Sequence, residues 1–131
     1  HSRRARGFAT YAALRELGRH GVADLVERCC RYAGEMVTRI GALPVAAAVR
    51  VGEMNQGLVR FLDPRPGATE QDHDARTDQV VAAINATGEA FFTPTTWRGK
   101  RCMRVSVSSW RTTPSDVDRA VAAAARVLSA R

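Results

Sequence analysis

An apolar stripe with helical spacing runs through residues 22–40 and constrains the fold more than any other feature of the sequence. Its members are Val22, Leu25, Val26, Cys29, Tyr32, Ala33, Met36, Val37 and Ile40. Spacings of three and four predict an amphipathic helix that buries one face against a core. Gly41 follows the stripe, and Gly18 and Gly21 precede it. Residues 6 to about 42 are therefore predicted to form two helices with a junction at these two glycines.

Short apolar runs in the rest of the chain predict two strand pairs, each joined by a turn. The predicted segments are strands 45–51, 57–62, 89–96 and 101–107, and helices 75–86 and 116–131. Thr113 and Pro114 mark the start of the last helix, since threonine caps and proline suits the first position. The order predicts an α+β fold, with helices on one face of a small antiparallel sheet and two helices preceding it. We divide the chain into a helical segment, 1–42, and an α+β domain, 43–131.

Composition excludes several classes of protein. The 131 residues allow one modest core, and no apolar run is long enough for a membrane span. The net charge is +7, but the 19 arginines are scattered and no basic block interleaves with aromatic residues, so nucleic-acid binding is not favoured. The three cysteines form no CxxC pair, which predicts reduced thiols in a cytoplasmic protein without a metal site. Because the chain begins with His1, we expect a fragment or a processed product.

Most candidate catalytic residues have simpler structural explanations. Lys100, the only lysine, lies in a predicted polar turn and is expected to be solvated. The run 72–74 (Asp-His-Asp) lies in a predicted loop without a second cluster of metal ligands. Cys29 and Cys102 have no evident histidine partner and are expected to be inert thiols. His20 is expected to be a turn or cap residue.

Arg104 is more informative, because it interrupts the apolar strand 101–107 between Met103 and Val105. An arginine on the strand face away from the core is either simply solvated or presents its planar fork to a carboxylate. The opening residues Ser2, Arg3 and Arg4 form a short cationic stretch before the first helix. This stretch is either a frayed terminus or a docking segment. The sequence by itself describes an accessory domain better than a complete catalyst.

Four stretches follow one another in unbroken order over nearly the whole chain. They are residues 2–18 (SRRARGFATYAALRELG), 55–61 (NQGLVRF), 80–88 and 89–121, the last with a TT..DVD helix start. Together they resemble the C-terminal part of the pyridoxal-phosphate-dependent group II amino-acid decarboxylases. Residues 2–18 resemble the opening segment of that part, residues 55–61 and 80–88 resemble a strand and a helix ending, and residues 89–121 resemble the closing segment with its LR strand. The resemblance implies the small domain of a fold-type I pyridoxal-phosphate enzyme.

In this family, a preceding large domain carries the lysine, aspartate and histidine that hold the cofactor, and none has a counterpart here. The resemblance therefore implies that the chain alone neither holds pyridoxal phosphate covalently nor turns over. It places Arg104 near the amino-acid substrate, and Ser2, Arg3 and Arg4 near the domain junction and the interface of a homodimer. The implied function is to close the active-site cleft of a decarboxylase and position its substrate.

Two departures from the family pattern leave the exact reaction open among decarboxylation, a related carbon–carbon cleavage and transamination. Many members have Asn-Pro where this chain has Ser109 and Trp110, and many have Trp near the position of Tyr11. The alternatives are a stand-alone α+β binding or regulatory module and a nucleic-acid-binding domain. We also expect an exposed apolar face at Phe8 and Tyr11, covered in the parent by its missing portion or by the partner subunit.

Overall fold

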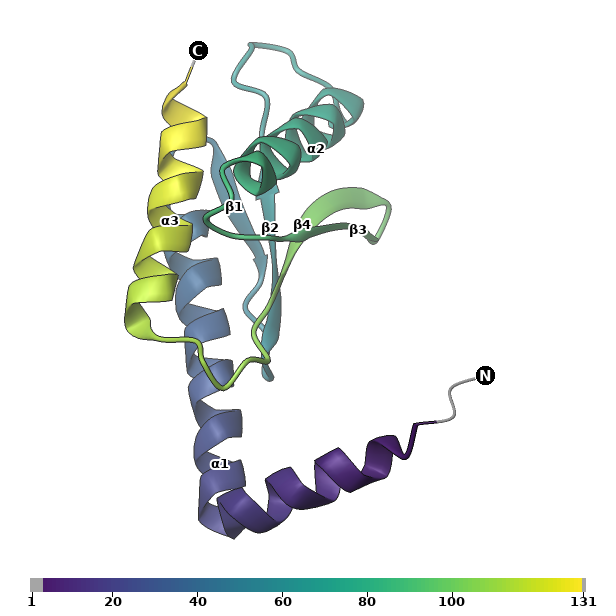
Figure 1. Ribbon diagram of the computed structural model, residues 1–131. Coiled ribbons are helices and arrows are strands. Elements are labelled where there is room, and N and C mark those ends of the chain that lie inside the picture. The colour runs from purple at the N-terminus through teal and green to yellow at the C-terminus, as the bar shows by residue number, and fades with distance from the viewer. Residues whose placement is uncertain (1–3, 131) are drawn as a thin grey trace.

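The computed structural model describes residues 4–130, which form one antiparallel sheet and the helices packed against it (Figure 1). In chain order, the elements are α1 (Arg6–Gly41), β1 (Ala46–Arg50), β2 (Gln56–Phe61), α2 (Glu70–Ala86), β3 (Thr93–Trp97), β4 (Lys100–Ser106) and α3 (Pro114–Ser129). The strand order is β1-β2-β4-β3, with each neighbouring pair antiparallel. This arrangement confirms the predicted α+β fold. Within residues 4–130, no helix combines the length and apolar content needed to cross a bilayer.

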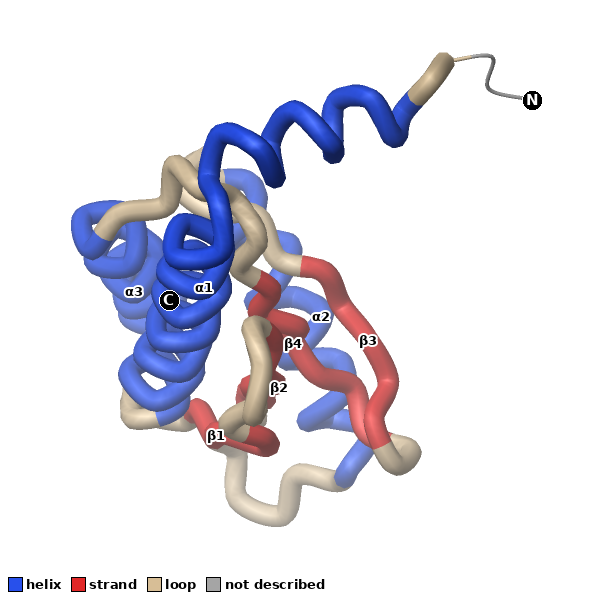
Figure 2. The backbone as a smooth tube through the Cα atoms, turned by 90° about the horizontal axis from the view of Figure 1, so that it is seen from below, coloured by secondary structure: helices blue, strands red, loops and turns tan. Residues whose placement is uncertain are grey.

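Helix α1 changes direction at Gly18, which has φ 65° and ψ −177° inside an otherwise helical element. This conformation belongs to a region that is essentially restricted to glycine. The segment before it, residues 6–17, projects away from the rest of the molecule and is exposed along its whole length (Figures 1 and 2). We call this segment the arm. The two predicted helices are therefore the two halves of α1, and Gly21 lies inside the second half.

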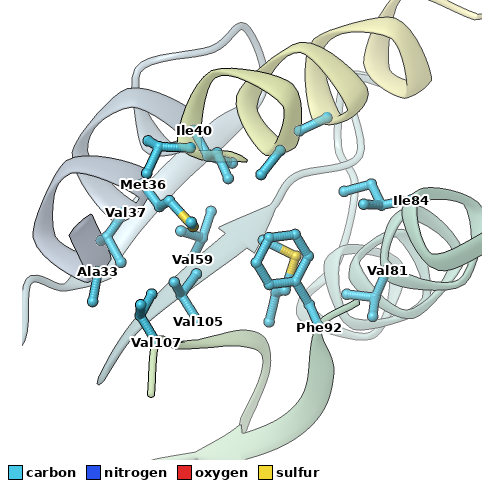
Figure 3. Close-up of a cluster of buried hydrophobic side chains, with 14 of the residues drawn as sticks. Ala33, Met36, Val37, Ile40, Val59, Val81, Ile84, Phe92, Val105 and Val107 are labelled. Atoms are coloured by element: carbon cyan, nitrogen blue, oxygen red, sulfur yellow. The ribbon is translucent and has the colours of Figure 1, made fainter. Parts of the chain in front are cut away.

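The hydrophobic core lies between the sheet and all three helices (Figure 3). Helix α1 contributes Ala33, Met36, Val37 and Ile40, α2 contributes Val80, Val81 and Ile84, α3 contributes Val117, Ala120 and Ala124, and the sheet contributes Val59, Phe61, Met103 and Val105. Helix α1 approaches β2 closely at Gly57, where an added Cβ would lie only 2.5 Å from Cγ2 of Val37. Burial of these side chains on one sheet face supplies the main driving force for the fold.

Two predicted boundaries differ from the structure for identifiable reasons. Helix α2 begins at Glu70 instead of about residue 75, because Thr69 and Asp72 form a reciprocal capping box. Strand β3 begins at Thr93 instead of residue 89. Just before it, the side chain of Asn85 donates to the carbonyl of Phe92 and accepts from its N–H, both at 2.8 Å. These two bonds occupy the backbone groups that a strand would use for its ladder.

Strands β2 and β4 separate beyond Val59, and side chains from α2 fill the fork between them. The β2–β4 ladder runs from Gln56 to Val59. Beyond it, the Thr77 hydroxyl accepts from the N–H of Phe61 at 3.1 Å and donates to its carbonyl at 2.9 Å. On the other side of the fork, Asp74 Oδ1 accepts from the backbone N–H of Arg101 at 2.9 Å. Helix α2 thereby replaces the missing ladder bonds and fixes where the β3–β4 hairpin lies.

Candidate functional site

Arg104 lies on the sheet face that the helices do not cover. Successive side chains on a strand point to opposite faces, and its neighbours Met103 and Val105 are both fully buried in the core. Arg104 is consequently exposed on the opposite face, which we call the open face. The expectation that Arg104 lies on the strand face away from the core is confirmed.

The sheet register defines what surrounds Arg104 on the open face. Arg104 pairs with Leu58 on β2 and with Thr93 on β3, and Leu58 pairs in turn with Arg50 on β1. Directly paired residues of antiparallel strands share a face and lie close together. Arg50, Leu58, Arg104 and Thr93 therefore form a single row across the open face.

A groove of about 240 Å³ follows this row. Its lining residues are Arg50, Gln56, Gly57, Leu58, Thr95, Trp97 and Arg104. Two guanidinium groups thus share the groove with polar, apolar and aromatic groups but with no carboxylate. Among residues 4–130, the side chain of Arg104 has no hydrogen-bond or ion-pair partner, so its guanidinium is available to an anion.

Trp97 forms one end of the groove and contacts two arginines. The guanidinium carbon of Arg50 lies 5.7 Å from the ring centroid, and that of Arg98 lies 5.5 Å from it. Trp97 is positioned by the β3–β4 turn, in which Arg98 and Gly99 have φ of 49° and 76°. Positive φ at both central residues is typical of the tight turns that join antiparallel strands. The predicted turn at residues 97–100 is therefore present.

An ion-pair network centred on the buried side chain of Arg60 lies in the fork between β2 and β4. The side chain of Arg60 is only 6% exposed, and its Nη2 donates to Asp74 Oδ1 at 3.0 Å and contacts Glu70 Oε2 at 2.8 Å. The backbone N–H of Arg101 and then the guanidinium of Arg60 lower the pKa of Asp74. Sequence analysis missed this network, although Arg60 interrupts the apolar run GLVRFL as Arg104 interrupts its own strand.

In a second groove of similar size, the acidic side chains are already bonded to other residues of the chain. It has a volume of about 250 Å³, lies beside the start of α3 and includes Glu89 and Asp116. Glu89 pairs with Arg119 at 2.7 Å, and Asp116 caps the helix through Thr113. Electrostatics therefore distinguish the two grooves, because only the groove at Arg104 presents arginines without acidic partners.

Lys100 and the run 72–74 make contacts that account for their presence without a catalytic or metal-binding role. The Lys100 side chain is 55% exposed, with Nζ 3.9 Å from a carboxylate oxygen of Glu70. The Asp-His-Asp run lies within the first two turns of α2, so its prediction as a loop was wrong. Asp72 completes the helix cap, and His73 Nδ1 accepts from the N–H of Asp63 at 2.9 Å. Among residues 4–130, no His, Cys, Asp and Glu side chains gather into a group that could hold a metal ion.

The remaining candidates are not brought together by the fold. Cys29 and Cys102 are buried free thiols, and burial raises the pKa of Cys102, which makes this thiol a poorer nucleophile. His20 lies exposed in α1, two residues after the change of direction, and not in a turn. Ser2 and Arg3 lie outside the described residues, whereas Arg4 is exposed just before α1.

Comparison with solved structures shows that the fold recurs in decarboxylases. The chain is similar to Oryza sativa TDC crystallised with PLP and tryptamine, with a TM-score of 0.83 over 95% of this chain at 20% sequence identity. It is similar to Catharanthus roseus tryptophan decarboxylase in complex with L-tryptophan, with a TM-score of 0.76 over 90% of this chain at 16% identity. A Vibrio parahaemolyticus glutamate decarboxylase domain, from a diaminobutyrate-pyruvate transaminase and L-2,4-diaminobutyrate decarboxylase, gives 0.70 over 90% at 13% identity.

The chain spans only about a quarter of these proteins, 27% of the Oryza protein and 24% of the other two. Neither protein-family models nor curated protein sequences give a significant match. The structural likeness therefore establishes a shared fold. The chain has the fold of one small part of these decarboxylases.

Proposed function

We propose that this chain is the C-terminal small domain of a pyridoxal-phosphate-dependent group II amino-acid decarboxylase. The observation that carries the proposal is Arg104, an arginine without an acidic partner in a groove on the open face of a fold found in decarboxylases. The motif order along the sequence supports the same assignment independently of the structural likeness. In this proposal the chain contributes to substrate binding and not to the bond-breaking step.

The role proposed for Arg104 is to bind and orient the carboxylate of an amino-acid substrate. A guanidinium presents parallel N–H donors that match the two oxygens of a carboxylate, so it fixes orientation as well as position. The apolar floor at Leu58 reduces hydration beside the bound group, which strengthens a charge-assisted hydrogen bond. The open face would accordingly form one wall of the cleft and exclude water from it.

The residues of this chain do not fit a covalent pyridoxal phosphate site. Such a site needs a lysine whose amine can lose its proton, which burial favours. Lys100, the only lysine in the sequence, is more than half exposed at a hairpin turn and lies beside Glu70. The cofactor would therefore belong to a preceding large domain of the parent, and we assign no step through it to this chain.

The arm of α1 supports a further contact within the parent. Phe8, Tyr11, Leu14 and Leu17 are exposed at spacings of three, so successive members are neighbours on the helix surface and the stripe winds halfway around the arm. An unsupported apolar stripe of this kind marks an interface. We propose that the large domain or the second subunit of a homodimer covers it, and that Ser2, Arg3 and Arg4 lie near the same junction.

The three free cysteines fit a cytoplasmic location.

Substitution of Arg104 in the full-length parent tests the proposal. Loss of one charge-assisted bidentate contact corresponds to about a ten- to hundredfold loss of kcat/KM, so we expect that decrease for Arg104→Gln. Arg104→Lys keeps the charge but loses the planar guanidinium with its parallel N–H donors, so this variant should retain only part of the activity. Steady-state decarboxylation, measured as CO₂ release, provides the readout.

The matched control is Arg111→Gln, because Arg111 is exposed and lies outside the groove. Its kinetics should equal those of the unmodified parent. Unchanged kinetics in Arg104→Gln would refute the role of this residue. A parent without pyridoxal-phosphate-dependent activity toward any amino acid would favour a stand-alone binding module instead.

A further inference from the structure

The groove contains a second arginine whose position the proposed role of Arg104 does not explain. Arg50, at the end of β1, lies in the same row of the sheet as Arg104, with Leu58 between them. Neighbouring strands are about 4.8 Å apart, so these two Cα atoms are separated by roughly 10 Å. The two guanidinium groups therefore flank a short apolar strip on the open face.

Arg50 and Arg104 are among the arginines of residues 4–130 that have no carboxylate partner, and these two line the same groove. Arg60, Arg101 and Arg119 each contact a carboxylate oxygen at 3.0 Å or less. Arg50 and Arg104 contact none among residues 4–130, and no acidic side chain lines their groove. Two like charges over a low-dielectric apolar floor repel each other unless an anion is bound. The groove thus has an uncompensated charge of +2 that an anionic ligand would neutralise.

The aromatic wall at Trp97 leaves the hydrogen-bonding edge of Arg50 free. Arg50 contacts the face of the Trp97 ring, with its guanidinium carbon 5.7 Å from the centroid. A guanidinium over the face of a ring is attracted by the ring's π-electrons. Among residues 4–130, no hydrogen bond or ion pair uses the N–H groups of Arg50, so they are available to a ligand.

We propose that Arg50 and Arg104 together form a binding site for a small dicarboxylate. Each guanidinium binds one carboxylate, and Leu58 contacts the methylene groups between them. If the chain has the proposed function, the site has a consequence for the parent enzyme, and this step rests on that function. The substrate of the parent is then an amino acid with a carboxylate in its side chain. An aromatic amino acid would place its ring beside Arg50 and leave that charge without a partner.

Binding to this chain tests the site without any cofactor. The probes are glutarate, butyrate and inorganic phosphate, and chemical shift changes at low ionic strength report their dissociation constants. We expect glutarate to bind at least about tenfold more tightly than butyrate, since only glutarate satisfies both guanidinium groups. Arg50→Gln and Arg104→Gln should each remove this preference, because either change leaves a single guanidinium that can bind only one carboxylate.

Arg111→Gln is again the matched control and should bind all three probes as the unmodified chain does. Equal binding of glutarate and butyrate would overturn the two-arginine site. Phosphate binding that matches glutarate and is insensitive to Arg50→Gln would also overturn it, because it would indicate attraction by net charge alone. Circular dichroism of each variant separates a loss of binding from a loss of fold.

Kinetics of the full-length parent test the consequence for substrate choice. We expect decarboxylation of aspartate or glutamate to exceed that of tryptophan or tyrosine. For the acidic substrate, Arg50→Gln should raise KM by about tenfold or more. A parent that decarboxylates aromatic amino acids equally well with Arg50→Gln would overturn this inference and leave the proposed function intact. A parent that decarboxylates no amino acid would overturn the proposed function, while the binding measurements would still decide the dicarboxylate site.

Discussion

On β4, Met103 and Val105 are fully buried beneath the helices, whereas Arg104 between them is exposed on the open face. The same alternation separates Val59 from Leu58 on β2. The helix-covered face therefore carries the apolar core, whereas the open face carries Arg50 and Arg104, which have no carboxylate partner among residues 4–130. Since each strand supplies both faces, substitutions one residue apart should affect different properties of the molecule.

The largest effect is expected from Phe61→Ala on the helix-covered face. Phe61 is fully buried on β2, and removal of a buried phenylalanine side chain leaves a cavity that lowers the free energy of unfolding by about 3–5 kcal/mol. Urea unfolding followed by circular dichroism measures this change. A decrease below about 1 kcal/mol would contradict the assignment of Phe61 to the core and, with it, the distinction between the two faces.

An intermediate effect is expected from Asp74→Asn in the fork. This change leaves Arg60 buried with Glu70 as its remaining carboxylate partner, and we expect a loss of about 1–3 kcal/mol, less than for a fully buried pair because Asp74 is 28% exposed. Asp78→Asn is the matched control, since Asp78 is more exposed and also pairs with Arg101. Its loss should be at most about 1 kcal/mol. Equal losses would contradict a special role for the fork.

The same residue gives a test of the pH dependence. The pKa of Asp74 is lower in the folded chain than its ordinary value of 3.8, so its carboxylate binds a proton less readily when folded. The stability it confers is therefore fully present above that ordinary value and is lost as the pH falls through the folded value. Asp74→Asn should flatten the acid limb of a plot of unfolding free energy against pH below about 4, whereas Asp78→Asn should change it less.

The smallest effect on stability is expected from Arg104→Gln in this chain. Its side chain is exposed and has no partner among residues 4–130, so the free energy of unfolding should change by less than about 0.5 kcal/mol. The same urea measurement applies. A loss above 1 kcal/mol would show that Arg104 supports the fold and would weaken its assignment to ligand binding.

The sequence predicted the features that depend on local periodicity. The apolar stripe identified the buried part of α1 from Cys29 to Ile40, although Val26, another of its members, is 46% exposed. The position of Arg104 between two apolar residues identified the open face of β4. The start of α2 was also accessible, because Thr69 followed three residues later by Asp72 is a capping signal. Its loop-like composition concealed that signal in the sequence analysis.

The groove and the fork between β2 and β4 depend on contacts between residues far apart in the sequence, which local periodicity does not predict. Arg50 and Arg104 are 54 positions apart and share a row only because of the register of β1, β2 and β4. Register follows from turn geometry and from which faces are buried, so one sequence does not fix it. The contacts of Asp74 and Thr77 arise because β2 and β4 diverge, which becomes visible only in the assembled sheet.

The direction of the arm depends on Gly18, because a residue with a Cβ atom rarely adopts the backbone conformation found there. Nothing lies within 4 Å of the position that its Cβ would occupy, so the requirement for glycine comes from its φ of 65° alone and not from crowding. An alanine at this site would favour an unbroken helix and swing the twelve-residue arm, about 18 Å long, to a new bearing. The direction of the arm is thus set by a single residue, separately from both the core and the groove.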